Sequence, residues 1–208
     1  MSEPVMDATN QTATPPSETV TVLLCGVGGQ GTILGADLLA RSAMAAGWQV
    51  KLSEIHGMSQ RGGAVTTMVR FGPEVASMVA DPGYVDHIIA FESTEALRNL
   101  PFLKPGGGCF VSDEVIKPLP VLTGQATMPQ DAIGVLEQAG ALLVPALRLA
   151  IEAGNPKCSN VVLLGVLAKA LGFAPQVWQE QISLRLPERL VEVNLAAFEA
   201  GYHFEQAA

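Results

Sequence analysis

The chain has 208 residues, of which 49% are hydrophobic and 15% charged, and its formal net charge is −8 at pH 7. This length suits one domain with a full core. A composition rich in small apolar residues and low in charge fits either close packing of helices on a sheet or a large surface that is buried against a partner. Lys and Arg form no cluster, which argues against nucleic-acid binding, and the apolar stretch 161–173 is too short to cross a bilayer and contains Lys169.

The N-terminal stretch predicts where the folded domain begins, and the cysteine spacing indicates which metal sites to expect. Residues 1–19 are polar, with neither the basic start nor the apolar segment of a signal peptide, so we expect a disordered leader there and one domain over 20–208. Cys25, Cys109 and Cys158 form no CxxC pair, so the spacing of iron–sulfur and zinc sites is missing. Reduced thiols and a cytoplasmic location are expected.

The segments in chain order alternate between strand and helix patterns. An apolar run that ends in glycine predicts a buried strand at 20–26, and apolar residues at helical spacing predict a helix at 32–46. Ser93 or Thr94 is the expected N-cap of a later helix. Further strands are predicted at 48–54, 64–72, 85–92, 109–113 and 141–145, and further helices at 93–103, 130–140, 146–154, 159–172, 175–186 and 187–201.

The part that follows the second strand departs from a dinucleotide-binding pattern. Residues 55–63 contain three glycines and lack helical periodicity, where such a fold would place a helix. The strand at 64–72 leads to a turn at Gly72-Pro73 and then to 74–80, which predicts an antiparallel hairpin at a sheet edge. We therefore expect an α/β domain with helices on both sheet faces and an antiparallel edge.

The stretch "GVGGQG" at 26–31 joins the first strand to the first helix. Gly26 would permit the tight turn, Gly28 would let backbone amides approach a phosphate, and Gly31 would allow close helix–strand packing. The helix N-terminus favours anions. Three interpretations stay open: an NAD or FAD site, a site for another phosphate or anion, and a turn that is merely packed or docked on a partner. Glu54, 23 positions after Gly31, stands where a ribose-binding acid is expected.

The loop "EIHGMSQRGG" at 54–63 carries the other candidate groups. A histidine such as His56 can act as acid, base or hydrogen-bond donor, and Arg61 can clamp a carboxylate or phosphate. The alternatives are a strand-end cap for His56 and an ion pair for Arg61. Asn160 is either an N-cap or an interface group. The sequence shows no Ser-His-Asp order, carboxylate dyad or metal cluster, which points to chemistry completed by a partner.

Taken together, several motifs carry a family resemblance. They are "GVGGQGT", "SEIHGMSQRGGAVTTMVRFG", "GYVDHIIAFESTEALRNLPFLKPGG", "NVVLLGVLAKALGF" and "VEVNLAAFEAG". Over about residues 20 to 203 the chain resembles the small, gamma-type subunit of 2-oxoacid:ferredoxin oxidoreductases, most closely in the indolepyruvate branch.

The resemblance implies a Rossmann-like three-layer α/β/α fold with a mixed sheet, and a subunit of an enzyme that oxidatively decarboxylates an arylpyruvate to an aryl-acetyl-CoA and reduces ferredoxin. Thiamine diphosphate with Mg and [4Fe–4S] clusters are implied on a large subunit, CoA is the co-substrate, and an α2β2 assembly is expected. Relatives that act on 2-oxoglutarate or phenylglyoxylate share the main motifs. A free-standing NAD-dependent enzyme and a purely structural adaptor are the rival classes.

The resemblance also places both glycine-containing loops at the partner and the active-site cleft. The candidate catalytic residues are His56 and Arg61, and no metal ligand is expected in this chain. The candidate cofactor-binding residues are Gly26, Gly28, Gly29, Gln30, Gly31, Glu54, Gln60, Gly62 and Gly63.

Overall fold

Six strands form one mixed sheet in the computed structural model, which describes residues 18–56, 63–117, 119–125 and 127–206. They are β1 (Val20–Val27), β2 (Gln49–His56), β3 (Ala64–Gly72), β4 (Val85–Ala90), β5 (Leu103–Ser112) and β6 (Leu142–Val144). Their order across the sheet is β2-β3-β1-β4-β5-β6. β3 runs antiparallel to both of its neighbours, β1 and β2, whereas the pairs from β1 through β4 and β5 to β6 are parallel.

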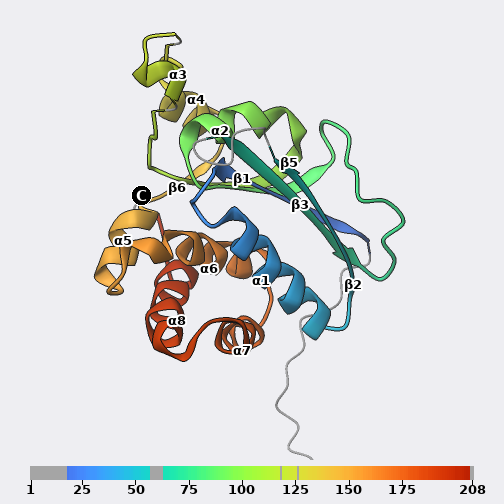
Figure 1. Cartoon of the computed structure of the whole chain (residues 1–208). Coiled ribbons are helices and arrows are strands. Elements are labelled where there is room, and N and C mark those ends of the chain that lie inside the picture. Colours follow the sequence, from blue (N-terminus) through green and yellow to red (C-terminus); the bar gives the residue numbers. More distant parts are fainter. Residues whose placement is uncertain (1–17, 57–62, 118, 126, 207–208) are drawn as a thin grey trace, which may run out of the picture.

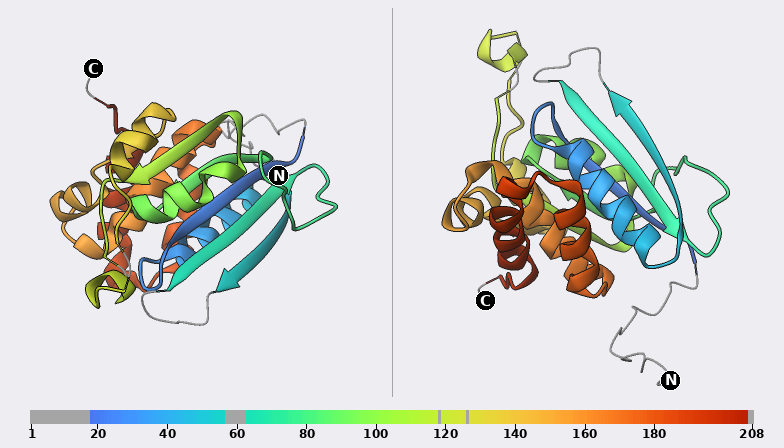
Figure 2. Two further views of the ribbon diagram at one scale, coloured as in Figure 1. Left: turned by 90° about the horizontal axis from the view of Figure 1, so that it is seen from above. Right: turned by 60° about the horizontal axis from the view of Figure 1, so that its bottom comes forward.

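Helices cover both faces of this sheet (Figure 1). They are α1 (Thr32–Ala45), α2 (Ser93–Asn99), α3 (Leu119–Leu122), α4 (Ala132–Gln138), α5 (Ala146–Glu152), α6 (Ser159–Leu171), α7 (Pro175–Arg185) and α8 (Glu188–Tyr202), with short 3-10 turns at Leu100–Phe102 and Pro156–Cys158. The larger core joins one sheet face to α1, α5, α6, α7 and α8. The smaller core joins the other face to α2 and α4, so the molecule has three layers (Figure 2).

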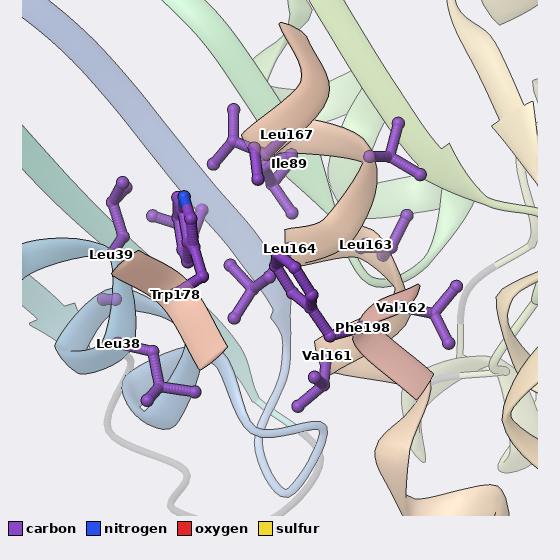
Figure 3. Close-up of a cluster of buried hydrophobic side chains, with 14 of the residues drawn as sticks. Leu38, Leu39, Ile89, Val161, Val162, Leu163, Leu164, Leu167, Trp178 and Phe198 are labelled. Carbon is purple, nitrogen blue, oxygen red and sulfur yellow. The ribbon is translucent and has the colours of Figure 1, made fainter. Parts of the chain in front are cut away.

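Helix α6 lies at the centre of the larger core (Figure 3). Every residue from 160 to 168 is buried, which explains why this segment is apolar on all sides instead of along one stripe. Trp178 of α7 and Phe198 of α8 stack with ring centroids 6.0 Å apart next to it. Burial of such large side chains supplies most of the favourable free energy of folding.

Helices α6 and α8 approach each other through glycines. A Cβ atom at Gly201 would overlap the carbonyl oxygen of Val162, and one at Gly165 would overlap the carbonyl oxygen of Phe198. The two backbones are therefore in direct contact. Only glycine fits at either position, because backbone atoms cannot turn aside as a flexible side chain can.

The α/β class, the mixed sheet and the helices on both faces are confirmed. The strands and helices predicted along 141–201 all form, with ends that shift by a few residues. Among the described residues, no helix has both the length and the apolar character needed to cross a membrane.

The predicted hairpin was wrong in its second strand. Residues 74–80 form no strand, and β3 instead pairs antiparallel with β2, which precedes it. Side chains of the neighbouring strands bind the carbonyl groups of 74–80: Lys51 Nζ donates to Ala76 O at 3.0 Å, and Arg70 donates to Ser77 O and Val79 O at 2.9 Å. These carbonyls are satisfied without a strand partner.

Two local boundaries also differ from expectation. Strand β5 begins at Leu103, so "KPGGG" lies within it, with Gly106 at φ +77° and a register shift against β4 between Val85 and His87. The N-cap of α2 is Glu92, not Ser93 or Thr94. Its carboxylate accepts from the amide of Thr94 at 3.0 Å and from the amide of Glu95.

Candidate functional site

The carboxyl ends of the parallel strands β1, β2, β4, β5 and β6 meet at one edge of the sheet. The loop 27–31 leaves β1 there, α2 starts there after β4, and β2 ends there at His56. In open α/β sheets this edge is where ligands bind, because loops and helix N-termini converge on it. We call it the carboxyl edge.

Gln30 fixes the conformation of the glycine loop. Its Oε1 accepts from the amide of Val27 at 2.7 Å, and its Nε2 donates to the carbonyl of Phe91 at 2.9 Å. Its own amide donates to the carbonyl of Val27 at 3.1 Å. Both ends of this side chain form hydrogen bonds inside the chain, so Gln30 holds the loop against the residue that follows β4. Its role in cofactor binding stays a prediction.

The glycines of the loop serve different purposes. Gly26 belongs to β1 and makes no turn, contrary to expectation; a Cβ there would lie 2.8 Å from Gln30 Oε1 and 3.0 Å from Phe91 Cβ. Gly29 and Gly31 adopt left-handed φ angles of +104° and +84°. These angles make the turn, and they favour glycine because a Cβ strains this conformation.

Gly31 is also where helix α6 meets the loop. Asn160, 3% exposed in the first turn of α6, donates from Nδ2 to the carbonyl of Gly31 at 3.3 Å. A Cβ at Gly31 would overlap this Nδ2 atom. The expected close packing at Gly31 is thus present, against the side chain of Asn160, and Asn160 supports the loop instead of capping its own helix.

The two glycine-containing loops meet at Gly28 and Gly63. The amide of Gly28 donates to the carbonyl of Gly63 at 2.9 Å, next to the pairing of Val27 with Ala64. This bond engages the Gly28 amide within the chain. It also brings the carboxyl end of β1 beside the connection between β2 and β3, so both sequence motifs lie at one place on the carboxyl edge.

The structure describes only part of the second loop. His56 is the last residue of β2, opposite Val65 of β3, and its backbone therefore lies at the carboxyl edge. The predicted site residues Gln60, Arg61 and Gly62 lie outside the described residues.

Glu54 does not occupy the place of a ribose-binding acid. Such an acid ends a strand that directly neighbours β1, whereas β3 lies between β1 and β2 here. Glu54 instead lines a groove of about 900 Å³ between α1, β2 and α7, together with Ile33, Leu34, Asp37 and Leu184. The strand order therefore argues against Glu54 as part of an NAD site and leaves the glycine loop as the feature that resembles one.

Sequence reasoning missed a buried polar group at the start of α2. Glu92 is 1% exposed and Glu95 is 5% exposed, and they lie where β4 reaches the carboxyl edge. Burial raises the pKa of Glu95, partly opposed by Arg98, whose Nε lies 3.2 Å from its carboxylate. The sequence "ESTE" carries a signal for this cap, because Glu92 and Glu95 have the spacing of the first and last residues of a capping box.

The three cysteines are free and buried, and they do not form an iron–sulfur site. Burial raises the pKa of the Cys109 thiol to about 11 and that of the Cys25 thiol well above its ordinary value. A [4Fe–4S] cluster is held by four thiolates, and the sequence has three cysteines. Within the described part of the chain, no group of three or more His, Cys, Asp or Glu side chains is placed to hold a metal ion.

Comparison with known proteins gives a consistent answer. Residues 21–204 match the pyruvate ferredoxin/flavodoxin oxidoreductase family. Indolepyruvate oxidoreductase subunit IorB of Pyrococcus horikoshii is 41% identical over 187 residues, which cover 86% of this chain and 93% of that protein.

Solved structures share the fold. The gamma subunit of a keto/oxoacid ferredoxin oxidoreductase from Geobacter sulfurreducens superposes with a TM-score of 0.66 at 24% identity, over 88% of this chain and 96% of that one. The 2-oxoglutarate:ferredoxin oxidoreductase from Magnetococcus marinus superposes with a TM-score of 0.64 at 19% identity, over 92% of this chain but 32% of that one. By its sequence match over nearly the whole chain, this protein belongs to the pyruvate ferredoxin/flavodoxin oxidoreductase family.

Proposed function

We propose that this protein is the small subunit of a cytoplasmic indolepyruvate:ferredoxin oxidoreductase, which decarboxylates an arylpyruvate oxidatively to an aryl-acetyl-CoA. The observation that carries the proposal is the 41% identity to an indolepyruvate oxidoreductase subunit across 93% of its length. The junction of the two family motifs at Gly28 and Gly63 supports it, because it gives the motifs a shared surface.

The cofactors belong to the large partner subunit in this proposal. Thiamine diphosphate activates the 2-oxoacid and iron–sulfur clusters carry the electrons away when they are bound. The donor set of this chain fits neither: three separate buried cysteines cannot supply four cluster ligands, and the described residues offer no metal site to anchor a diphosphate. The role left to this chain is to shape and close the site.

We infer that the carboxyl edge performs that role. The first amides of α1 have no intrahelical acceptors, and the helix dipole adds a partial positive charge there. Gln30 and Asn160 hold the loop rigid, so these groups are oriented before an anion arrives. Arg61 then clamps a substrate carboxylate or CoA phosphate, and His56 donates a hydrogen bond near the acyl group.

The substrate is tested with the purified complex of both subunits. A panel of indolepyruvate, phenylpyruvate, phenylglyoxylate, 2-oxoglutarate and pyruvate is assayed with CoA and ferredoxin, and the assembly is weighed by light scattering. We expect the highest kcat/KM for the two arylpyruvates and a mass that corresponds to α2β2. A preference for 2-oxoglutarate or phenylglyoxylate would assign the protein to another branch of the family.

The anion clamp is tested by Arg61→Ala in the same complex. Loss of a charge-assisted pair should raise the KM for CoA or for the 2-oxoacid about tenfold, since such bonds contribute about 1.5–3 kcal/mol. Arg148→Ala is the matched control, because Arg148 is exposed on α5 and pairs with Glu152 of the same helix. Unchanged KM values for both substrates would remove Arg61 from the site.

Two measurements address the rival classes. Titration calorimetry of the isolated subunit with NADH should show no saturable binding, and micromolar affinity would revive a dehydrogenase function. The large subunit alone should be inactive; full activity without this chain would make the protein a structural adaptor.

A further inference from the structure

The connection between β5 and α4 leaves the body of the molecule. Figure 1 shows it running out to α3 and back, and the right-hand view of Figure 2 shows the same projection. We call the described residues 115–117, 119–125 and 127–130 the arm.

Both ends of the arm are held firmly. At one end, the amide of Asp113 donates to Val144 O at 3.0 Å, and Glu114 O accepts from Ser93 N at 3.2 Å. At the other end, Asp131 adopts φ +51° and accepts from the amide of Gly134 at 3.1 Å as the N-cap of α4. The arm therefore starts and ends at defined points beside the carboxyl edge, and its direction is set by folded structure.

The described side chains of the arm lie outside the interior of the molecule. None of its described side chains belongs to either hydrophobic core or is buried. Val115 is 53% exposed and Leu122 is 66% exposed. A loop of this length loses conformational entropy when it is ordered, and burial of exposed side chains such as Leu122 on a partner would offset that loss. Long loops in compact domains are usually functional.

The composition of the arm matches the centre of a protein interface. The sequence 115–130 contains one charged residue, Lys117, in a chain with a net charge of −8. Charged residues are depleted at interface cores and apolar ones enriched. Pro120 and Pro129 restrict the backbone, which lowers the entropy lost when the arm docks.

We propose that the arm is the docking element that grips the large catalytic subunit. The inference rests on the proposed function, which supplies that partner. The arm rises from the carboxyl edge, the same edge that carries the glycine loop and His56, so a partner that covers those loops also meets the arm. The same fold covers 32% of the Magnetococcus marinus oxidoreductase chain, so there it is part of a longer chain.

A pair of variants tests the arm directly. Leu122→Asp and Val115→Asp place a charge at exposed positions, so the isolated subunit should keep its melting temperature. Titration against the purified large subunit should give a dissociation constant at least tenfold higher for each. Met44→Asp is the matched control, because Met44 is 63% exposed at the C-terminal end of α1, which runs back from the carboxyl edge; it should bind like the parent protein.

A label gives a second measurement that does not depend on lost affinity. The native cysteines are all buried, so Leu122→Cys provides a single reactive thiol for an environment-sensitive dye. Addition of the large subunit should shift the emission to the blue, and the same dye on Met44→Cys should not respond.

The results that would contradict the docking role differ from the result that would contradict the proposed function. Unchanged affinity of both arm variants together with a silent dye at position 122 would overturn the proposal. A blue shift that depends on the concentration of this chain alone would overturn it in favour of a second copy as the occupant. Binding is measured without substrate, so a complex that assembles through the arm but rejects arylpyruvates would contradict the proposed function and leave the docking role standing.

Discussion

Replacing Gly31 by alanine should destabilise the subunit through two separable effects. The first is backbone strain, because φ at Gly31 is +84°; an L-residue in this conformation costs about 1–2 kcal/mol. The second is steric, because the new Cβ would overlap Nδ2 of Asn160 and break its bond to Gly31 O. A displaced buried amide costs about 1–3 kcal/mol. Together we expect a loss of about 3 kcal/mol.

Gly29→Ala separates the two effects. Gly29 has φ +104°, but no atom lies within 4 Å of the position of its Cβ. This variant should therefore lose only the backbone term, about 1–2 kcal/mol. Urea unfolding of the isolated subunit measures both values, which are large against the usual total of about 5–15 kcal/mol for a domain.

A double-mutant cycle then isolates the contact with Asn160. In an Asn160→Ala background the overlap is gone, so Gly31→Ala should cost no more than Gly29→Ala. If Gly31→Ala costs the same in both backgrounds, then Asn160 does not constrain the loop and the steric argument fails.

Three other predictions concern the core. Gly201→Ala should leave little folded protein in expression trials, because its Cβ meets the carbonyl of Val162 and backbone cannot move aside; a loss under 1 kcal/mol would contradict this. The pKa of Glu95 is raised in the folded state, so stability should fall as pH rises from its ordinary value through the raised one, and Glu95→Gln should remove that fall in urea titrations from pH 4 to 8. Cys25 and Cys109 should react with a thiol reagent at pH 8 only after unfolding, since burial and raised pKa values suppress the thiolate; fast labelling of the native protein would refute this.

Local patterns were enough to predict most of the fold. Apolar periodicity located α1 and the helices from α5 to α8, and glycine at the end of an apolar run located β1. The pairing of strands was harder to predict, because the alternation of apolar and polar residues in 74–80 resembles that of a strand. Only the tertiary structure shows that Lys51 and Arg70 bind the carbonyls of this segment.

The location of the site was predictable from the sequence, but the roles of several of its residues were not. Spacing alone identified the glycine loop and the turn it makes, but the role of Gln30 depends on Phe91, 61 positions away, and that of Gly31 on Asn160, 129 positions away. Contacts of this range leave no local trace in the sequence. The position of Glu54 was misjudged for the same reason, since the insertion of β3 beside β1 is a property of the sheet as a whole.

The central position of β1 has a consequence for synthesis on the ribosome. β1 is the first strand of the sheet to emerge, yet its partners follow late: Val20 pairs with Phe71, and Val22 pairs with His87, 65 residues further on. At about 5–20 residues per second, this strand waits roughly 3–13 s for its second neighbour. Until β3 emerges, the apolar run "VTVLLCGV" has no strand to pair with. The nascent chain therefore presents a natural binding site for a chaperone at its start, and folding of the domain is paced by translation through β4.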